Sequence, residues 1–120
     1  MQNLNQIRAR NVLCFATDPK INIRGQNGGE VIKKIPPVIM NNGFLGALAY
    51  SMDKNMGAWK SVFDGVAEHL SCEDVAIIPE DRNGARELLE YLADPNTTSD
   101  KLREATDEAM AWLEFARRLV

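Results

Sequence analysis

Residues 33–54 read KKIPPVIMNNGFLGALAYSMDK, and eighteen of them, from Ile35 to Met52, carry no charge. Two adjacent prolines and an Asn-Asn-Gly triplet interrupt this apolar run. A helix that crosses the hydrocarbon core of a membrane needs about 20 consecutive apolar residues. The run is short of that length, broken twice and flanked by charges. It therefore predicts two packed helices of a globular protein rather than a membrane span.

The two interruptions predict where these helices begin and end. Pro36-Pro37 removes two backbone donors and is expected to kink or restart the helix there. The Asn-Asn-Gly triplet tolerates the positive φ that the end of a helix requires. We therefore expect one helix from about residue 29 to residue 40 and a second one over about 44–52.

Apolar residues recur at helical spacing along the rest of the chain. The first helix has apolar residues on most sides, so we expect other helices to cover it, and it should end at Asp18-Pro19. Residues 20–29 are expected to form a loop, and residues 75–84 a loop or the end of a helix. Thr97 with Asp100 resembles a capping box. Further helices are expected over residues 59–70, 85–92 and 102–119. The pattern predicts an all-α bundle of about six helices.

Composition agrees with one helical domain over residues 1–120. The chain is 45% hydrophobic and 26% charged, which is typical of soluble globular proteins. The N-terminus lacks the basic and then apolar pattern of a signal peptide, so we expect a cytoplasmic protein. In that compartment, Cys14 and Cys72 are expected to be reduced, buried thiols rather than a disulfide.

The net charge of −3 is unevenly distributed. Residues 1–60 carry eight Lys and Arg against three Asp and Glu, whereas residues 61–120 carry six against fourteen. Two interpretations are open at this point. Either the protein has a basic face that meets phosphates and an acidic face that meets another partner, or both halves simply solvate their helices.

Residues suited to catalysis or metal binding are scarce. His69 is the only histidine, and the two cysteines, Cys14 and Cys72, are far from each other in the sequence. The chain therefore lacks the ligand spacing of a zinc site. A structural role for His69 is expected, although Cys72 three residues on leaves a Cys-His pair open. Adjacent carboxylates such as Asp107-Glu108 are expected to be solvated. The glycine-rich segment RGQNGGE lacks the strand and the Gly-Lys-Ser/Thr ending of a phosphate-binding loop. We predict no enzyme activity, no metal and no cofactor.

Basic residues are the better functional candidates. Arg8 and Arg10 lie on the first predicted helix, and Lys33, Lys34 and Lys54 flank the uncharged run. Such side chains can hold the phosphates of a nucleic acid without sequence preference. Ordinary surface charges are the alternative explanation, because no ladder of aromatic residues accompanies them. The residues alone indicate a helical binding or assembly module.

The same run resembles a family signature. The run contains, in this order, Lys-Ile-Pro at residues 34–36, an apolar triplet at residues 38–40 and Asn-Gly-Phe at residues 42–44. Ser51 and Lys54 then lie at the end of the next predicted helix. This order resembles the small subunit of the Cmr complex, the type III-B CRISPR RNA-guided effector. Arg8-Ala9 resembles that family's first helix. The resemblance covers most of the chain except residues 18–28 and 71–83. The motif positions concerned are Lys34 to Pro36, Val38 to Met40, Asn42 to Phe44, Ser51, Lys54, Thr106, Glu108, Trp112 and Ala116.

The resemblance implies a compact all-α fold and a non-catalytic role in antiviral defence. Copies of the small subunit would stack as an inner filament beside the backbone subunits, with guide RNA and target RNA as further partners. They would steady the target RNA, paired with the guide RNA, by contacts to its backbone, and other subunits would cut it. The RNA contacts would be Arg8, Lys33, Lys34 and Lys54, and the structural motif residues Pro36, Asn42, Gly43 and Trp112.

Three positions depart from the family pattern, and two other interpretations are open. Pro37 and Phe44 replace a small residue and a leucine, and Asp53 weakens the positive field at Lys54. A helical adaptor or DNA-binding regulator is one alternative, although the segment FLGALAYSM is too apolar for a recognition helix in a DNA groove. The small subunit of the type III-A complex, which has less of the Asn-Gly motif, is the other alternative.

Overall fold

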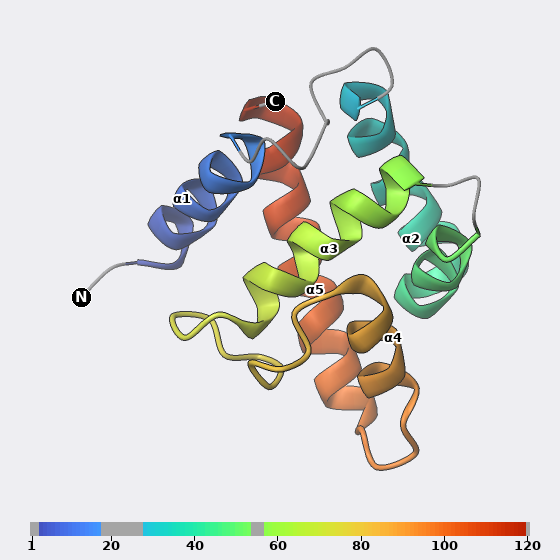
Figure 1. Ribbon diagram of the computed structural model, residues 1–120. Coiled ribbons are helices and arrows are strands. Elements are labelled where there is room, and N and C mark those ends of the chain that lie inside the picture. The colour runs from blue at the N-terminus through green and yellow to red at the C-terminus, as the bar shows by residue number, and fades with distance from the viewer. Residues whose placement is uncertain (1–2, 18–27, 54–56, 120) are drawn as a thin grey trace.

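The computed structural model describes residues 3–17, 28–53 and 57–119, and these residues form helices and loops without any strand. Figure 1 shows the arrangement of the helices. The second helix is two segments joined at Gly43, so there are six helical segments in the described part of the chain. This confirms the predicted all-α class. The helices are α1 (Leu4–Thr17), α2 (Gly28–Ser51), α3 (Gly57–Ser71), α4 (Ala85–Ala93) and α5 (Ser99–Leu119).

The break in α2 lies at the Asn-Asn-Gly triplet and not at the prolines. Gly43 has φ 78° and ψ 163°, a conformation that is essentially confined to glycine. Pro36 and Pro37 lie inside the helical segment before it, so the restart expected at the prolines is wrong. The buried side chains around the prolines, Ile32, Ile35 and Ile39, explain why this segment stays helical. Their packing outweighs the two missing backbone hydrogen bonds.

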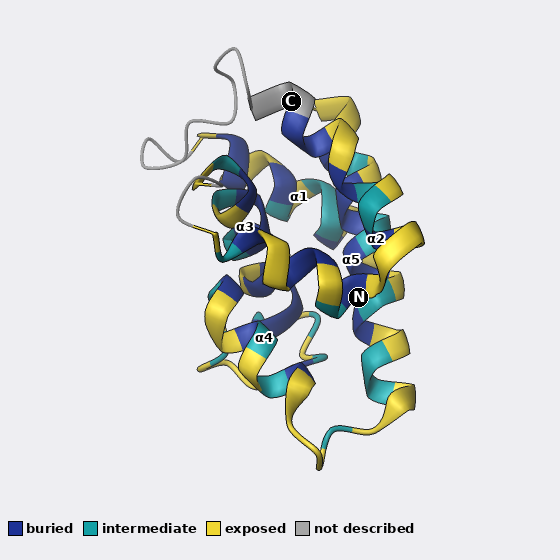
Figure 2. Ribbon diagram, turned by 90° about the vertical axis from the view of Figure 1, so that its right-hand side faces the viewer, coloured by how far each residue is buried: buried dark blue, intermediate teal, exposed yellow. Residues whose placement is uncertain are grey.

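Helix α5 lies at the centre of the fold. It packs against α1, α2 and α3, while α4 packs against α2 and α3. In Figure 1, α5 passes between α1 on the left and α2 on the right. Figure 2 shows that buried residues occupy the inner sides of the helices and exposed residues the outer turns. Trp112 of α5 is fully buried, and its ring meets that of Phe15 edge to face, with 5.2 Å between ring centroids.

Phe15 attaches α1 to α3 through a close approach at Gly65. A Cβ atom on Gly65 would collide with the Phe15 ring, so the absence of a side chain lets the two helices pack. Among the described helices, α1 packs mainly against α3 and α5. Leu13 on its outer side is 49% exposed. The expectation that other helices cover α1 on most sides is therefore wrong, because α1 lies at the edge of the molecule.

The segment between α3 and α4 is a loop, as predicted. It is fixed to the end of α3, since the backbone N–H groups of Ile77 and Ile78 both donate to the carbonyl oxygen of Leu70, at 3.0 and 3.2 Å. Ile78 is buried and attaches the loop to the core. The loop also contains Ala76 with φ 50°, which is unusual for a residue other than glycine.

The cap of α5 lies one residue after the predicted one. The hydroxyl oxygen of Thr98 accepts a hydrogen bond from the backbone N–H of Lys101 at 3.1 Å, which is the geometry of an N-cap. The hydroxyl of Thr97 instead donates to the carbonyl oxygen of Tyr91 at the end of α4. Thr97 therefore joins the two helices and does not start the second one.

Among the described helices, none has the length and apolar character to cross a membrane.

Candidate functional site

Lys33 and Lys34 lie next to each other on the outer surface of α2. Both are exposed, while the residues before and after them, Ile32 and Ile35, are buried. The apolar residues fix the helix face toward the core, so the two lysines point away from it. Among the side chains that the structure describes, which exclude those of residues 28–30, neither ammonium group has an ion pair or a side-chain hydrogen bond. The helix thus presents two exposed positive charges at neighbouring positions. Lys54, the third predicted lysine, lies outside the described residues.

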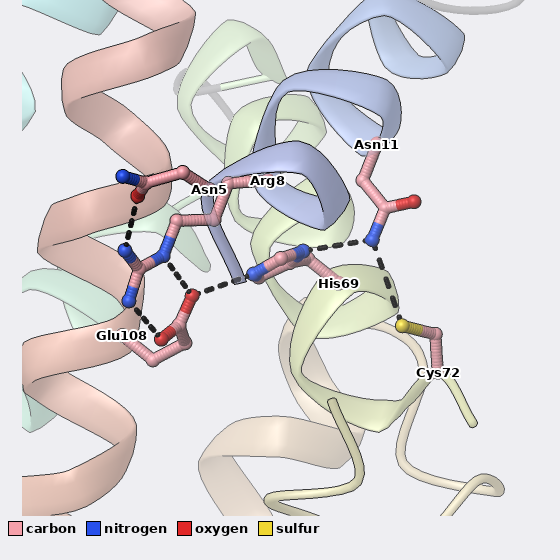
Figure 3. Close-up of polar contacts among 6 residues, drawn as sticks. All are labelled: Asn5, Arg8, Asn11, His69, Cys72 and Glu108. Carbon is pink, nitrogen blue, oxygen red and sulfur yellow. Dashed lines mark hydrogen bonds and ion pairs between the residues drawn. The ribbon is translucent and has the colours of Figure 1, made fainter. Parts of the chain in front are cut away.

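Arg8 has a different environment from these lysines. Its Nε and Nη2 atoms donate to the two carboxylate oxygens of Glu108, at 2.7 and 2.6 Å. Its Nη1 atom donates to Oδ1 of Asn5 at 2.8 Å. Figure 3 shows this two-pronged pair between α1 and α5. The Arg8 side chain is only 18% exposed, so the structure places it in the packing of α1 on α5 and not on an open surface like that of the lysines.

His69 continues this network into the core. Its Nε2 atom donates to Oε2 of Glu108 at 2.9 Å, and its Nδ1 atom accepts from the amide nitrogen of Asn11 at 2.9 Å. The same amide nitrogen lies 3.6 Å from Sγ of Cys72. Asn11 therefore separates the imidazole from the thiol, and no direct Cys-His pair forms. The expected structural role of His69 is confirmed, with almost complete burial.

The network changes the proton affinities of its members. Burial is the main cause that lowers the pKa of His69, and the charge of Arg8 adds to it, while the hydrogen bond to Glu108 opposes them. Burial pushes the pKa of Glu108 upward, but the hydrogen bonds from Arg8 and His69 outweigh it and hold the pKa below its usual value. The result is a charged Arg8–Glu108 pair beside a neutral imidazole at neutral pH.

Glu108 is a partner that the sequence analysis missed. Asp107 is exposed as predicted, whereas Glu108 is 5% exposed, so the expectation of a solvated pair is wrong for the second carboxylate. A signal was present in the sequence, because Glu108 falls within the apolar stripe of the last helix between Ala105 and Trp112. Three hydrogen bonds compensate the burial of its charge.

The thiols are less buried than expected. Cys72 is half-buried and Cys14 is exposed, and both are free. Cys14 lies at the margin of the contact between α1 and α3, where solvent reaches it. A cavity of about 130 Å³ lies between α1 and α3, with His69 and both thiols in its lining. No group of three or more His, Cys, Asp or Glu in the described residues could hold a metal ion.

The four predicted motif residues have structural positions. Trp112 is in the core and Gly43 forms the break in α2. Pro36 is half-buried in the first segment of α2, and Asn42 is exposed just before the break. The structure does not bring these four residues together into one site. They shape α2 and the core beneath it.

Comparison with protein-family models gives a match over residues 4–120 to CRISPR-associated protein (Cas_Cmr5). The chain belongs to the Cas_Cmr5 family. Comparisons with curated proteins and with solved structures gave no significant match. Membership makes the chain a CRISPR-associated small subunit of the type III-B Cmr complex, which contains other subunits and RNA. The predicted resemblance is therefore confirmed, and the family is a non-catalytic small subunit.

The match favours the type III-B family over the other interpretations of the sequence. It covers the helix with the two lysines, the break at Gly43 and the whole of α5. In this chain, α2 carries a lysine pair before an uncharged run, and a polar network joins α1, α3 and α5. The first of these features is exposed and suited to a partner, and the second is buried and suited to holding the fold.

Proposed function

We propose that this Cas_Cmr5 chain steadies target RNA in the effector complex through contacts to the RNA backbone, with Lys33 and Lys34 as the principal groups. The observation that carries the proposal is the pair of exposed lysines, which lack ion-pair partners among the side chains that the structure describes. No carboxylate occurs between residues 31 and 52. A phosphate that approaches α2 at Lys33 and Lys34 therefore meets two positive charges, with Glu30 as the nearest carboxylate before them in the sequence and Asp53 as the nearest after them.

Copies of the subunit would stack as an inner filament beside the backbone subunits, in antiviral defence in the cytoplasm. The uneven charge of the chain supports this arrangement, because a basic first half and an acidic second half can attract each other between copies. The chain would make no catalytic contribution and need no cofactor. Lys54 would extend the lysine contact, whereas Arg8 would contribute less, because three of its nitrogen atoms already bind Glu108 and Asn5.

Reconstitution of the complex from its partner subunits, guide RNA and target RNA tests this proposal. The double variant Lys33→Glu/Lys34→Glu should assemble but lose target RNA, and its difference from the unmodified protein should be largest at low salt and shrink as the salt concentration rises. Arg86→Glu/Arg103→Glu is the matched control, because it changes the net charge equally on exposed residues of α4 and α5. Equal retention of target RNA by both variants would refute the lysine contact. Failure of the unmodified chain to join the complex would refute the proposed role in it.

A further inference from the structure

A groove on α2 lies beyond the two lysines. Its lining consists of Val38, Asn42, Gly46 and Tyr50 of α2 together with Trp59 of α3, and its volume is about 480 Å³. The four residues of α2 recur at every fourth position, so they form one stripe along the helix. The stripe continues across the break at Gly43, which means that both segments of α2 contribute to one surface.

An aromatic pair closes the groove at one end. Tyr50 is 52% exposed, yet its ring lies edge to face against that of Trp59, with 5.1 Å between centroids and 74° between planes. Trp59 itself is buried and fixed in the core. An aromatic ring that is both accessible and held in place is a suitable platform for stacking a flat ligand.

The middle of the groove offers hydrogen bonding and space. Asn42 is exposed, and its amide group has no hydrogen-bond partner among the described residues. An amide supplies donors and an acceptor together, as the edge of a nucleobase requires. Gly46 has no side chain, so the space next to Asn42 stays open. A Cβ atom on Gly46 would lie only 3.3 Å from the Cβ atom of Asn42 and would narrow that space. The groove therefore combines an apolar floor with one uncommitted polar group.

Charge indicates which ligand fits this groove. Lys34 precedes Val38 by four residues and so lies on the same stripe, one turn before the groove begins. Sixteen positions separate Lys34 from Tyr50, which corresponds to about 24 Å of helix at 1.5 Å per residue and gives room for several nucleotides. Residues 35–52 carry no charge, so α2 itself places no carboxylate along the path between them.

We propose that this groove binds a short segment of single-stranded RNA, with a phosphate at Lys34, a base edge at Asn42 and a base stacked on Tyr50. The inference rests on the proposed RNA contact and adds a base-binding site to it. A purely apolar protein segment fits the groove less well, because it would bury the Asn42 amide without a partner and would leave Lys34 unused.

Fluorescence of the full-length chain tests the groove directly. The chain has two tryptophans, and Trp59 lines the groove while Trp112 is fully buried in the core. Titration with a short mixed-sequence single-stranded RNA should change the emission of Trp59. An abasic oligomer of the same length, which keeps the phosphates but lacks the bases, should bind more weakly and leave the emission unchanged.

Substitutions separate stacking from charge. Tyr50→Ala should weaken RNA binding about tenfold, because it removes one stacking surface, and should leave the salt dependence and the affinity for the abasic oligomer unchanged. Tyr50→Phe keeps the ring and should retain binding. Met40→Ala is the matched control, since Met40 is an apolar residue of the same helix, 77% exposed and outside the groove lining. Circular dichroism verifies that each variant is folded.

The outcomes distinguish the groove from the lysine contact. RNA binding that depends on Lys33 and Lys34 but not on Tyr50 would overturn the groove and leave the proposed function intact. An unmodified chain that binds no RNA at low salt would overturn both. If Tyr50→Ala keeps its RNA affinity but fails to join the partner subunits, the groove is a protein-docking surface and the inference is wrong.

Discussion

Arg8 and Glu108 lie 100 positions apart in the chain and form a two-pronged ion pair, with contacts of 2.7 and 2.6 Å. The pair joins the first helix to the last, and its carboxylate also accepts a hydrogen bond from His69 of α3. Three helices thus share one buried carboxylate. The resulting network gives Arg8 a structural role, which can be tested separately from RNA binding.

Arg8→Ala should lower the free energy of unfolding by about 2–3 kcal/mol. Removal of one partner leaves the Glu108 charge buried with less compensation, and the loss stays below that of a fully buried pair because Arg8 is partly exposed. Urea denaturation measures the change. Arg8→Lys should recover only part of the stability, since an ammonium group lacks the planar fork that binds both oxygens. Unchanged stability together with lost RNA binding would assign Arg8 to the RNA contact instead.

The stability should fall as the pH falls below about 6.5. The pKa of His69 in the folded protein lies below its ordinary value of 6.5, so the unfolded chain binds a proton there that the folded chain does not. The pKa of Glu108 lies below its ordinary value of 4.5, so further stability is lost as the pH falls below 4.5 and through the lower pKa of the folded protein. Both pKa shifts therefore make the folded protein less stable as the pH falls.

Urea denaturation at a series of pH values checks this dependence. His69 is the only histidine, so the loss just below pH 6.5 should be much reduced in His69→Gln. The loss around pH 4.5 should be reduced separately in Glu108→Gln, although that variant starts from a lower stability. Stability that rises as the pH falls from 7 to 5.5 would contradict the arrangement of the network.

Gly43→Ala should destabilise the fold by about 1–3 kcal/mol. The φ of 78° and ψ of 163° at this position are strained for any residue with a Cβ atom, even though the space around Gly43 is open. Thermal unfolding measures the loss. Gly57→Ala is a matched control, because its Cβ also meets nothing within 4 Å and no positive φ occurs there. Equal effects of the two substitutions would contradict the conformational explanation.

Gly65→Ala should also destabilise the fold, by about 1–3 kcal/mol, but for a steric reason. The added methyl group would collide with the Phe15 ring and push α1 away from α3. The double variant Gly65→Ala/Phe15→Leu should lose less stability than the sum of the two single variants, since the smaller side chain makes room for the methyl group. Additive losses would show that the two residues are not in close contact.

Much of the fold follows from local patterns in the sequence. The helical spacing of apolar residues predicts the described helices, and the Asn-Asn-Gly triplet predicts the break at Gly43. Both signals depend on residues near in sequence. The prediction at Pro36 and Pro37 fails because the packing of the surrounding isoleucines, which lie against distant helices, overrides a local preference.

The candidate site was less predictable for the same reason. The exposure of Lys33 and Lys34 follows from their position between buried neighbours on one helix. The environment of Arg8 depends on Glu108, a hundred residues away, and no spacing in the sequence joins them. The groove on α2 likewise needs Trp59 from another helix, although four of its residues recur at every fourth position. Contacts between residues that are distant in the sequence cannot be predicted from local sequence patterns.

The salt dependence of target RNA binding by the reconstituted complex tests the lysine contact most directly. A plot of the logarithm of the binding constant against the logarithm of salt concentration measures the number of phosphates contacted. Replacement of both Lys33 and Lys34 by alanine should make the slope shallower by about 1.4–1.8, as the loss of two phosphate contacts predicts. A complex with both alanines that keeps the wild-type slope and affinity would contradict the proposal that α2 holds the RNA backbone.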